Sequence, residues 1–160
     1  MVGVGRNERV LARLGELGTD ATIQLDQAAE ALKEAYLSEI GPGFDVILDY
    51  LWGEPTEALL AALTKGEFTV AGKETRLVQV GESAGAAIRL PAAVLRSTAV
   101  TILGTAGIPP RQVLFDAMKE VLQRGAMGEL RIETERAAMA DVESAWKRAG
   151  TAGRRIVMVP

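Results

Sequence analysis

Apolar residues along the chain recur at two alternating spacings, one typical of helices and one typical of strands. Residues 10–17 carry apolar side chains at helical spacing, and Gly18 follows as a residue suited to end a helix. Asp26 is placed to cap the next helix. The pattern predicts strands at 1–5, 21–25, 44–50, 76–80, 98–103, 130–132 and 155–159. It predicts helices at 10–17, 26–40, 56–63, 92–95, 110–122 and 139–149.

Strands and helices therefore alternate along the chain, which favours a mostly parallel sheet with helices on both faces. We expect one α/β domain over residues 1–160. Residues 44–50 are apolar on both faces, as in a buried parallel strand. The last two helices should bury their apolar residues, which are Leu114, Met118, Val121 and Leu122 in one and Met139, Val142, Ala145, Trp146 and Ala149 in the other.

Composition and charge exclude several functions. The 160 residues carry a net charge of −3 with scattered basic positions, which gives no reason to expect nucleic acid or a membrane as partner. No secretion signal or membrane-spanning stretch is visible, so we expect a cytoplasmic protein. Histidine and cysteine are absent, which excludes Ser-His-Asp catalysis and zinc sites built on those ligands. No cluster of carboxylates has metal-ligand spacing, and no metal is expected.

The opening segment MVGVGRNERV places two glycines just before a helix. A dinucleotide-binding fingerprint requires a preceding strand and a third glycine, but Glu8 stands at the third position. Met1 to Val4 are better interpreted as the end of a strand, followed by Gly5, Arg6 and Asn7. An arginine there can bind the 2′-phosphate of NADP, although a solvated arginine at a helix start is the alternative.

Four segments, taken in order, resemble one known family. They are VGVGRNERVLARLGELGTDATIQL, GFDVILDYLWGEP, RLVQVGESAG and ADVESAWKRAGTAGRRIVMVP. Together they are similar to the C-terminal half of the medium-chain dehydrogenase/reductase superfamily, the quinone-oxidoreductase and zinc-type alcohol-dehydrogenase-like enzymes. The resemblance implies a truncated Rossmann-like domain that lacks the first strand and its glycine-rich loop. It also implies that a tail from about residue 126 to 160 returns to the catalytic domain. Residues 65–75 depart from the family pattern, because the family has a short glycine turn there, and we expect the longer connection to form an extra hairpin.

The resemblance further implies a nicotinamide cofactor, NADP(H), held at the carboxyl ends of the parallel strands. The implied contacts are Gly5, Arg6 and Asn7 at the adenosine ribose and its 2′-phosphate; Leu51, Trp52 and Gly53 near the adenosine; Val80 and Gly81 beside the nicotinamide ribose; and Leu103, Gly104 and Thr105 near the nicotinamide ring. Asp45 and Asp49 are interpreted as strand-end residues, and Glu82 and Ser83 as a solvated loop.

Two functions follow as hypotheses. The first is the cofactor-binding part of an NADP(H)-dependent oxidoreductase that transfers hydride to a carbonyl or an activated alkene, with no assignable catalytic residue. The alternative is a non-catalytic nucleotide-binding or oligomerisation module, or one half of a split enzyme. Without the first strand, 1–5 and 44–50 should pair directly or be covered by another chain. The family pattern also implies a homodimer through Ser97 to Thr105.

Overall fold

The computed structural model describes residues 1–41, 43–64, 74–105, 109–130, 132–149 and 155–160. The chain divides into two compact units, Met1–Ala106 and Gly107–Pro160. The expectation of one domain over the whole chain remains a prediction.

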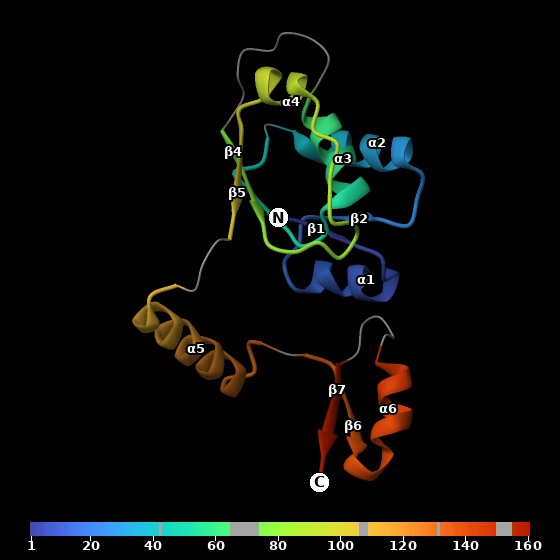
Figure 1. The fold of residues 1–160 in the computed structure, drawn as a ribbon, viewed down its shortest axis with the longest axis vertical. Helices are drawn as coiled ribbons and strands as arrows, with labels where there is room; N and C mark the ends of the chain where they lie inside the picture. The colour runs from blue at the N-terminus through green and yellow to red at the C-terminus, as the bar shows by residue number, and fades with distance from the viewer. Residues whose placement is uncertain (42, 65–73, 106–108, 131, 150–154) are drawn as a thin grey trace. The chain divides into compact units, whose positions relative to one another are not determined.

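The first unit alternates strands and helices in the order that the sequence predicts (Figure 1). Its elements are β1 (Val2–Gly5), α1 (Glu8–Glu16), β2 (Ala21–Gln24), α2 (Ala29–Ile40), β3 (Val46–Asp49), α3 (Gly53–Leu63), β4 (Thr75–Gln79), α4 (Ala92–Ser97) and β5 (Val100–Gly104). Gly18, at a φ of 93°, follows α1. Asp26 does not cap α2, because Ala28 occupies the cap position without a side-chain hydrogen bond.

The strands of this unit form two separate parallel sheets. β1 pairs with β2, and β3, β4 and β5 pair in that order. No hydrogen-bonded pairing joins β1 to β3 among the described residues, so direct pairing, one of the two expected outcomes for these strands, is not found. The predicted α/β fold with parallel sheets and covering helices is confirmed.

Packing between α2 and α3 holds the two sheets in one unit. The buried cluster at this contact contains residues of β2, α2 and α3, namely Ile23, Leu32, Tyr36, Ile40, Ala58, Leu59 and Ala62. Ile47 of β3 packs against this cluster and also against a second one, formed by Leu60, Leu77 and Val94. The core therefore lies on one side of the three-stranded sheet, where α3 and α4 cover it.

The opposite face of the three-stranded sheet is open. Val46 and Leu48 of β3 are 53% and 63% exposed, and Leu103 of β5 is also exposed. The sequence predicts that residues 44–50 are buried on both faces, and the structure corrects this prediction. Ile47 and Asp49 point to the helices, whereas the alternate residues Val46 and Leu48 are left without cover within the unit.

The second unit contains α5 (Arg111–Ala126), β6 (Thr134–Ala138), a short 3₁₀ helix (Met139–Asp141), α6 (Val142–Arg148) and β7 (Arg155–Val159). β6 and β7 form a parallel pair. The strand predicted at 130–132 is wrong, because Leu130 and Ile132 lie outside any strand and the strand begins at Thr134. Arg131 and the segment 65–73, which includes most of the expected hairpin, lie outside the described residues.

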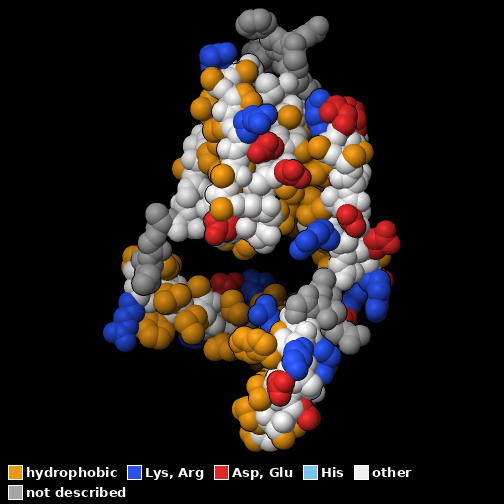
Figure 2. All heavy atoms as spheres, turned by 45° about the vertical axis from the view of Figure 1, so that its right-hand side comes forward, with side chains coloured by type: hydrophobic (Ala, Val, Ile, Leu, Met, Phe, Trp, Pro, Cys, Tyr) orange, Lys and Arg blue, Asp and Glu red, His pale blue; other side chains and the backbone are white. Residues whose placement is uncertain are grey.

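The apolar faces of the C-terminal helices are exposed, contrary to the sequence prediction. Every described apolar residue of α5 that was expected inside is exposed, including Leu122 at 70%. In α6, Ala145 is buried but Trp146 is 80% exposed. Figure 2 shows orange side chains gathered over α5. No described helix is long and apolar enough to cross a membrane.

Truncating a buried leucine tests the position of the core. Leu77 is fully buried in β4, so Leu77→Ala should lower the free energy of unfolding by about 2–5 kcal/mol, measured by urea denaturation. Leu95→Ala is the matched control, because Leu95 is 54% exposed on α4 and its truncation should cost less than about 0.5 kcal/mol. Equal losses in the two variants would contradict this core.

Candidate functional site

The buried carboxylate of Asp49 organises the turn after β3. Its Oδ1 accepts hydrogen bonds from the backbone N–H groups of Leu51 and Trp52 at 2.8 and 3.0 Å. Its Oδ2 accepts one from the hydroxyl of Thr56 in α3 at 2.7 Å. Asp49 is 6% exposed, and these three bonds offset the cost of burying its charge. The turn is thereby fixed between the strand and the first turn of α3.

The turn after β3 lies against the loop after β4. Ser83 donates its hydroxyl to the Tyr50 carbonyl at 2.9 Å, and the Ala84 N–H donates to the Leu51 carbonyl at 2.7 Å. Gly53 has a φ of 63°, and a Cβ there would lie 2.8 Å from the Ala84 carbonyl oxygen. Glycine is therefore required at this position, both by its backbone conformation and by the approach of the neighbouring loop.

The ends of β4 and β5 join the same group of loops. The Val80 N–H donates to the Asp49 carbonyl at 2.7 Å, and a Cβ on Gly81 would lie 3.0 Å from the Tyr50 carbonyl oxygen. Thr105 donates both its N–H and its hydroxyl to the Gln79 carbonyl, at 3.2 and 3.1 Å. The predicted residues at the ends of β3, β4 and β5 thus lie at one edge of one sheet.

The residues after β1 lie on the other sheet. Asn7 caps α1, because its Oδ1 accepts a hydrogen bond from the Val10 N–H at 3.2 Å. A Cβ on Gly5 would lie 3.4 Å from Leu11, so packing of α1 already accounts for a small residue there. The Arg6 carbonyl accepts a hydrogen bond from Gln24 Nε2 at 3.0 Å, while its side chain is exposed. Among the described residues, Arg6 has no ion pair with a carboxylate.

A groove of about 700 Å³ separates the two sheets. One wall is β1 and the other is β3, and side chains of α2 and α3 form its floor. The lining residues are Met1, Val2 and Val4 on the first wall, Gly43 to Leu51 on the second, and Tyr36, Pro55, Thr56 and Leu59 on the floor. Leu51 is the member of the predicted cofactor set that lines this groove.

Burial controls the ionisation of the tyrosine on the groove floor. Tyr36 is 4% exposed, and burial together with the nearby Asp49 carboxylate raises the pKa of its phenol to about 12. Burial is the larger cause, because the charged phenolate loses more solvation than the neutral phenol. Tyr36 is therefore a neutral packing residue at neutral pH, and nothing in its surroundings favours a role as a base.

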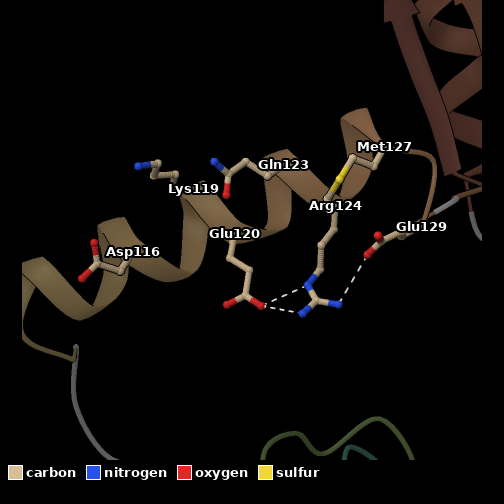
Figure 3. Close-up of a pocket in the computed structure, with 7 residues that line it drawn as sticks. All are labelled: Asp116, Lys119, Glu120, Gln123, Arg124, Met127 and Glu129. Carbon is tan, nitrogen blue, oxygen red and sulfur yellow. Dashed lines mark hydrogen bonds and ion pairs between the residues drawn. The ribbon is translucent and has the colours of Figure 1, made fainter.

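A second groove, of about 630 Å³, lies on α5 in the other unit. Figure 3 shows its seven lining residues, Asp116, Lys119, Glu120, Gln123, Arg124, Met127 and Glu129. Arg124 bridges Glu120 at 2.8 Å and Glu129 at 3.5 Å. The pair with Glu120 has the i,i+4 spacing that stabilises solvent-exposed helices by a few tenths of a kcal/mol. We interpret this groove as the polar face of α5.

Sequence reasoning missed the residues that fix the loops, namely Asp49, Thr56 and Ser83. Asp49 was assigned to a strand end and Ser83 to a solvated loop, but both tie the turn after β3 to its neighbours. An aspartate often marks a turn, because its carboxylate can accept hydrogen bonds from the backbone N–H groups two and three residues later. This signal is recognisable in the sequence. Within the described ranges, no group of three or more acidic residues is arranged to hold a metal ion.

Comparison with known proteins shows the same fold in solved structures. Neither a family model nor a curated protein matches the sequence. The structure of AibC aligns with a TM-score of 0.72 and 22% identity. Mycobacterial Rv1454c in complex with NADPH aligns with a TM-score of 0.69 and 14% identity, and the alcohol dehydrogenase from Aeropyrum pernix with 0.68 and 21%.

These alignments cover 99% of this chain but 41%, 48% and 42% of the respective structures. The chain therefore spans less than half the length of the structures that it matches. At these identities the likeness establishes the fold. The Rossmann-like α/β fold that the resemblance implies is confirmed.

The ionisation of Tyr36 gives a prediction for stability at high pH. An unfolded tyrosine ionises near pH 10, whereas folded Tyr36 stays neutral to about pH 12. Between these values the unfolded state binds fewer protons, so the free energy of unfolding should fall by about 2–3 kcal/mol as the pH rises. Urea denaturation across this range would measure the decline.

Tyr36→Phe should abolish most of that decline. Tyr50→Phe is the matched control, because Tyr50 is 59% exposed and its replacement should leave the decline in place. A decline that persists in Tyr36→Phe would show that other groups control the alkaline transition.

Proposed function

We propose that this chain is the cofactor-binding part of an NADP(H)-dependent oxidoreductase of the quinone-reductase or alcohol-dehydrogenase type. Hydride would pass between the nicotinamide ring and a carbonyl or an activated alkene. The observation that carries the proposal is the group of loops at the carboxyl ends of β3, β4 and β5. Ligands of parallel α/β sheets bind at that edge.

The loops provide a surface that a flat ligand could approach. A Cβ on Gly104 would have open space around it, so the end of β5 is not filled by neighbouring side chains. Because Gly53 and Gly81 have no Cβ, the loops after β3 and β4 lie in close contact. This contact fixes the position of the loops at this edge of the sheet. On this proposal, Val80, Gly81, Leu103, Gly104 and Thr105 border the nicotinamide half, and Leu51, Trp52 and Gly53 border the adenosine half.

Arg6 supports NADP(H) rather than NAD(H). Its exposed guanidinium follows β1 and has no carboxylate partner among the described residues. A guanidinium can form two parallel charge-assisted bonds to a phosphate, which only the 2′-phosphorylated cofactor offers there. Rv1454c, which shares the fold, binds NADPH in its solved structure. Asn7 would act indirectly, because its side chain caps α1 and so holds the backbone next to Arg6 in place.

Cofactor preference tests the proposal. NADPH at millimolar concentration should raise the melting temperature of the chain by a few degrees, and NADH should raise it less, because the ligand stabilises the native state by mass action. Arg6→Ala should remove the difference between the two cofactors. Arg96→Ala, which changes an exposed residue of α4, is the matched control and should keep the difference. The absence of a shift with either cofactor would contradict cofactor binding by this chain.

The alternative function, an oligomerisation module, requires a surface through which copies of the chain associate. β5 pairs with β4 on one edge, and its other edge has no strand neighbour among the described residues. Leu103 is exposed beside that edge. We propose that Ser97 to Thr105 forms a homodimer by strand pairing, since unpaired edges are templates for association.

Light scattering after size-exclusion chromatography should therefore give the mass of two chains. The Thr105 N–H bonds β4, so the N–H of the preceding Gly104 points outward. Gly104→Pro removes that outward donor and should shift the mass to one chain. Leu95→Ala is the control and should leave the dimer unchanged. Gly125→Pro is not a suitable control, because a proline there would break α5. A clean monomer in the unmodified chain would refute the dimer.

A further inference from the structure

The side chain of Gln24 connects the end of β2 to the segment that follows β1. Gln24 is the last residue of β2 and pairs with Gly5, the last residue of β1. The Leu25 N–H donates to the Gly5 carbonyl at 2.9 Å. Gln24 Nε2 then donates to the carbonyl of the next residue, Arg6, at 3.0 Å. A side chain therefore continues the strand pairing by one residue, up to Arg6.

The Arg6 backbone lies between two fixed points. On one side is Gly5, which β2 holds. On the other side is Asn7, whose Oδ1 and carbonyl accept hydrogen bonds from the N–H groups of Val10 and Leu11 at 3.2 and 2.9 Å. The bond from Gln24 acts on the Arg6 peptide between these points. Since the Arg6 side chain is exposed, its direction depends largely on how its backbone is held.

The other end of the Gln24 amide accepts no hydrogen bond. Its Oε1 is buried and has no partner among the described residues. Turning the amide over would place an oxygen against the Arg6 carbonyl, so the orientation with Nε2 toward Arg6 is the favourable one. A buried acceptor without a donor lowers stability, and an apolar side chain of similar length would avoid this cost. Stability alone therefore does not account for glutamine at this position.

An unsatisfied buried group is typical of a position that serves a binding site. The backbone carbonyl of Gln24 is held separately, because Gln27 Nε2 donates to it at 2.6 Å. What the Gln24 amide itself supplies is the donor to Arg6. The role of Gln24 is therefore to be found in what Arg6 does.

We infer that Gln24 is a positioning residue for Arg6, and that it sets the preference for NADP(H) by directing the guanidinium to the 2′-phosphate. The inference rests on the proposed function, in which Arg6 binds that phosphate. A guanidinium forms two parallel bonds to a phosphate only in a narrow range of orientations. A backbone that is already fixed reduces the conformational entropy lost when those bonds form. NADH has no 2′-phosphate and gains nothing from this positioning.

The variant Gln24→Met tests the inference. Methionine is unbranched like glutamine and has no N–H donor in its side chain. NADPH should bind this variant at least about fivefold more weakly, which is the effect of one lost hydrogen bond, whereas the Kd of NADH should change less than about twofold. Isothermal titration calorimetry gives both constants. Gln27→Met is the matched control, because it removes a bond of the same kind and leaves the bond to Arg6; it should keep the affinity for NADPH.

Two measurements without cofactor distinguish positioning from a purely structural role. The NMR order parameter of the Arg6 N–H should fall from about 0.85 toward about 0.6 in Gln24→Met, and should not fall in Gln27→Met. The melting temperature of unliganded Gln24→Met should equal or exceed that of the unmodified chain, because the substitution also removes the buried acceptor.

An unchanged affinity for NADPH, an equal loss for both cofactors, an unchanged order parameter at Arg6, or a marked fall in melting temperature would overturn the inference. If neither cofactor binds the unmodified chain, the proposed function fails, and the preference for NADP(H) fails with it. The order parameter in Gln24→Met then still decides whether Gln24 positions Arg6.

Discussion

The contact between α2 and α3 is the constraint on which the first unit depends. It buries Tyr36 and Ile40 of α2 against Ala58, Leu59 and Ala62 of α3. No backbone pairing joins the two sheets among the described residues, so this side-chain packing holds them together. Apolar packing is strong but non-directional, whereas hydrogen-bonded strand pairing fixes register. Side-chain packing therefore fixes the position of β1 relative to β3 less strictly than strand pairing would.

This arrangement divides the candidate site into two parts of different rigidity. Asp49 links the turn after β3 to α3 through three hydrogen bonds, and Ser83 links that turn to the loop after β4. Arg6 follows β1, across the groove, and is positioned through the α1 cap and the Gln24 side chain. A ligand that contacts both parts would act across the groove.

Residue pattern could predict the alternation of elements because strand and helix periods differ along this sequence. It could also locate Gly53 and Gly81. Glycine is required at both positions by close contact between loops rather than by space for a ligand. It failed at 134–138, where Thr-Glu-Arg-Ala-Ala has weak strand propensity and pairing with β7 decides the structure. Leu122 and Trp146 lie on amphipathic faces, and such a face predicts burial without showing what covers it. The bonds of Asp49 depend on a turn conformation that spacing alone does not determine.

Among the described residues, β1 and β3 are unpaired on their facing edges, and amide hydrogen exchange of the free chain tests this arrangement most directly. In β3, the Ile47 N–H points to β4, whereas the Val46 and Leu48 N–H groups point into the groove. The account predicts alternating protection, slow exchange at Ile47 and fast exchange at Val46 and Leu48. Protection of Val46 and Leu48 equal to that of Ile47 would contradict it.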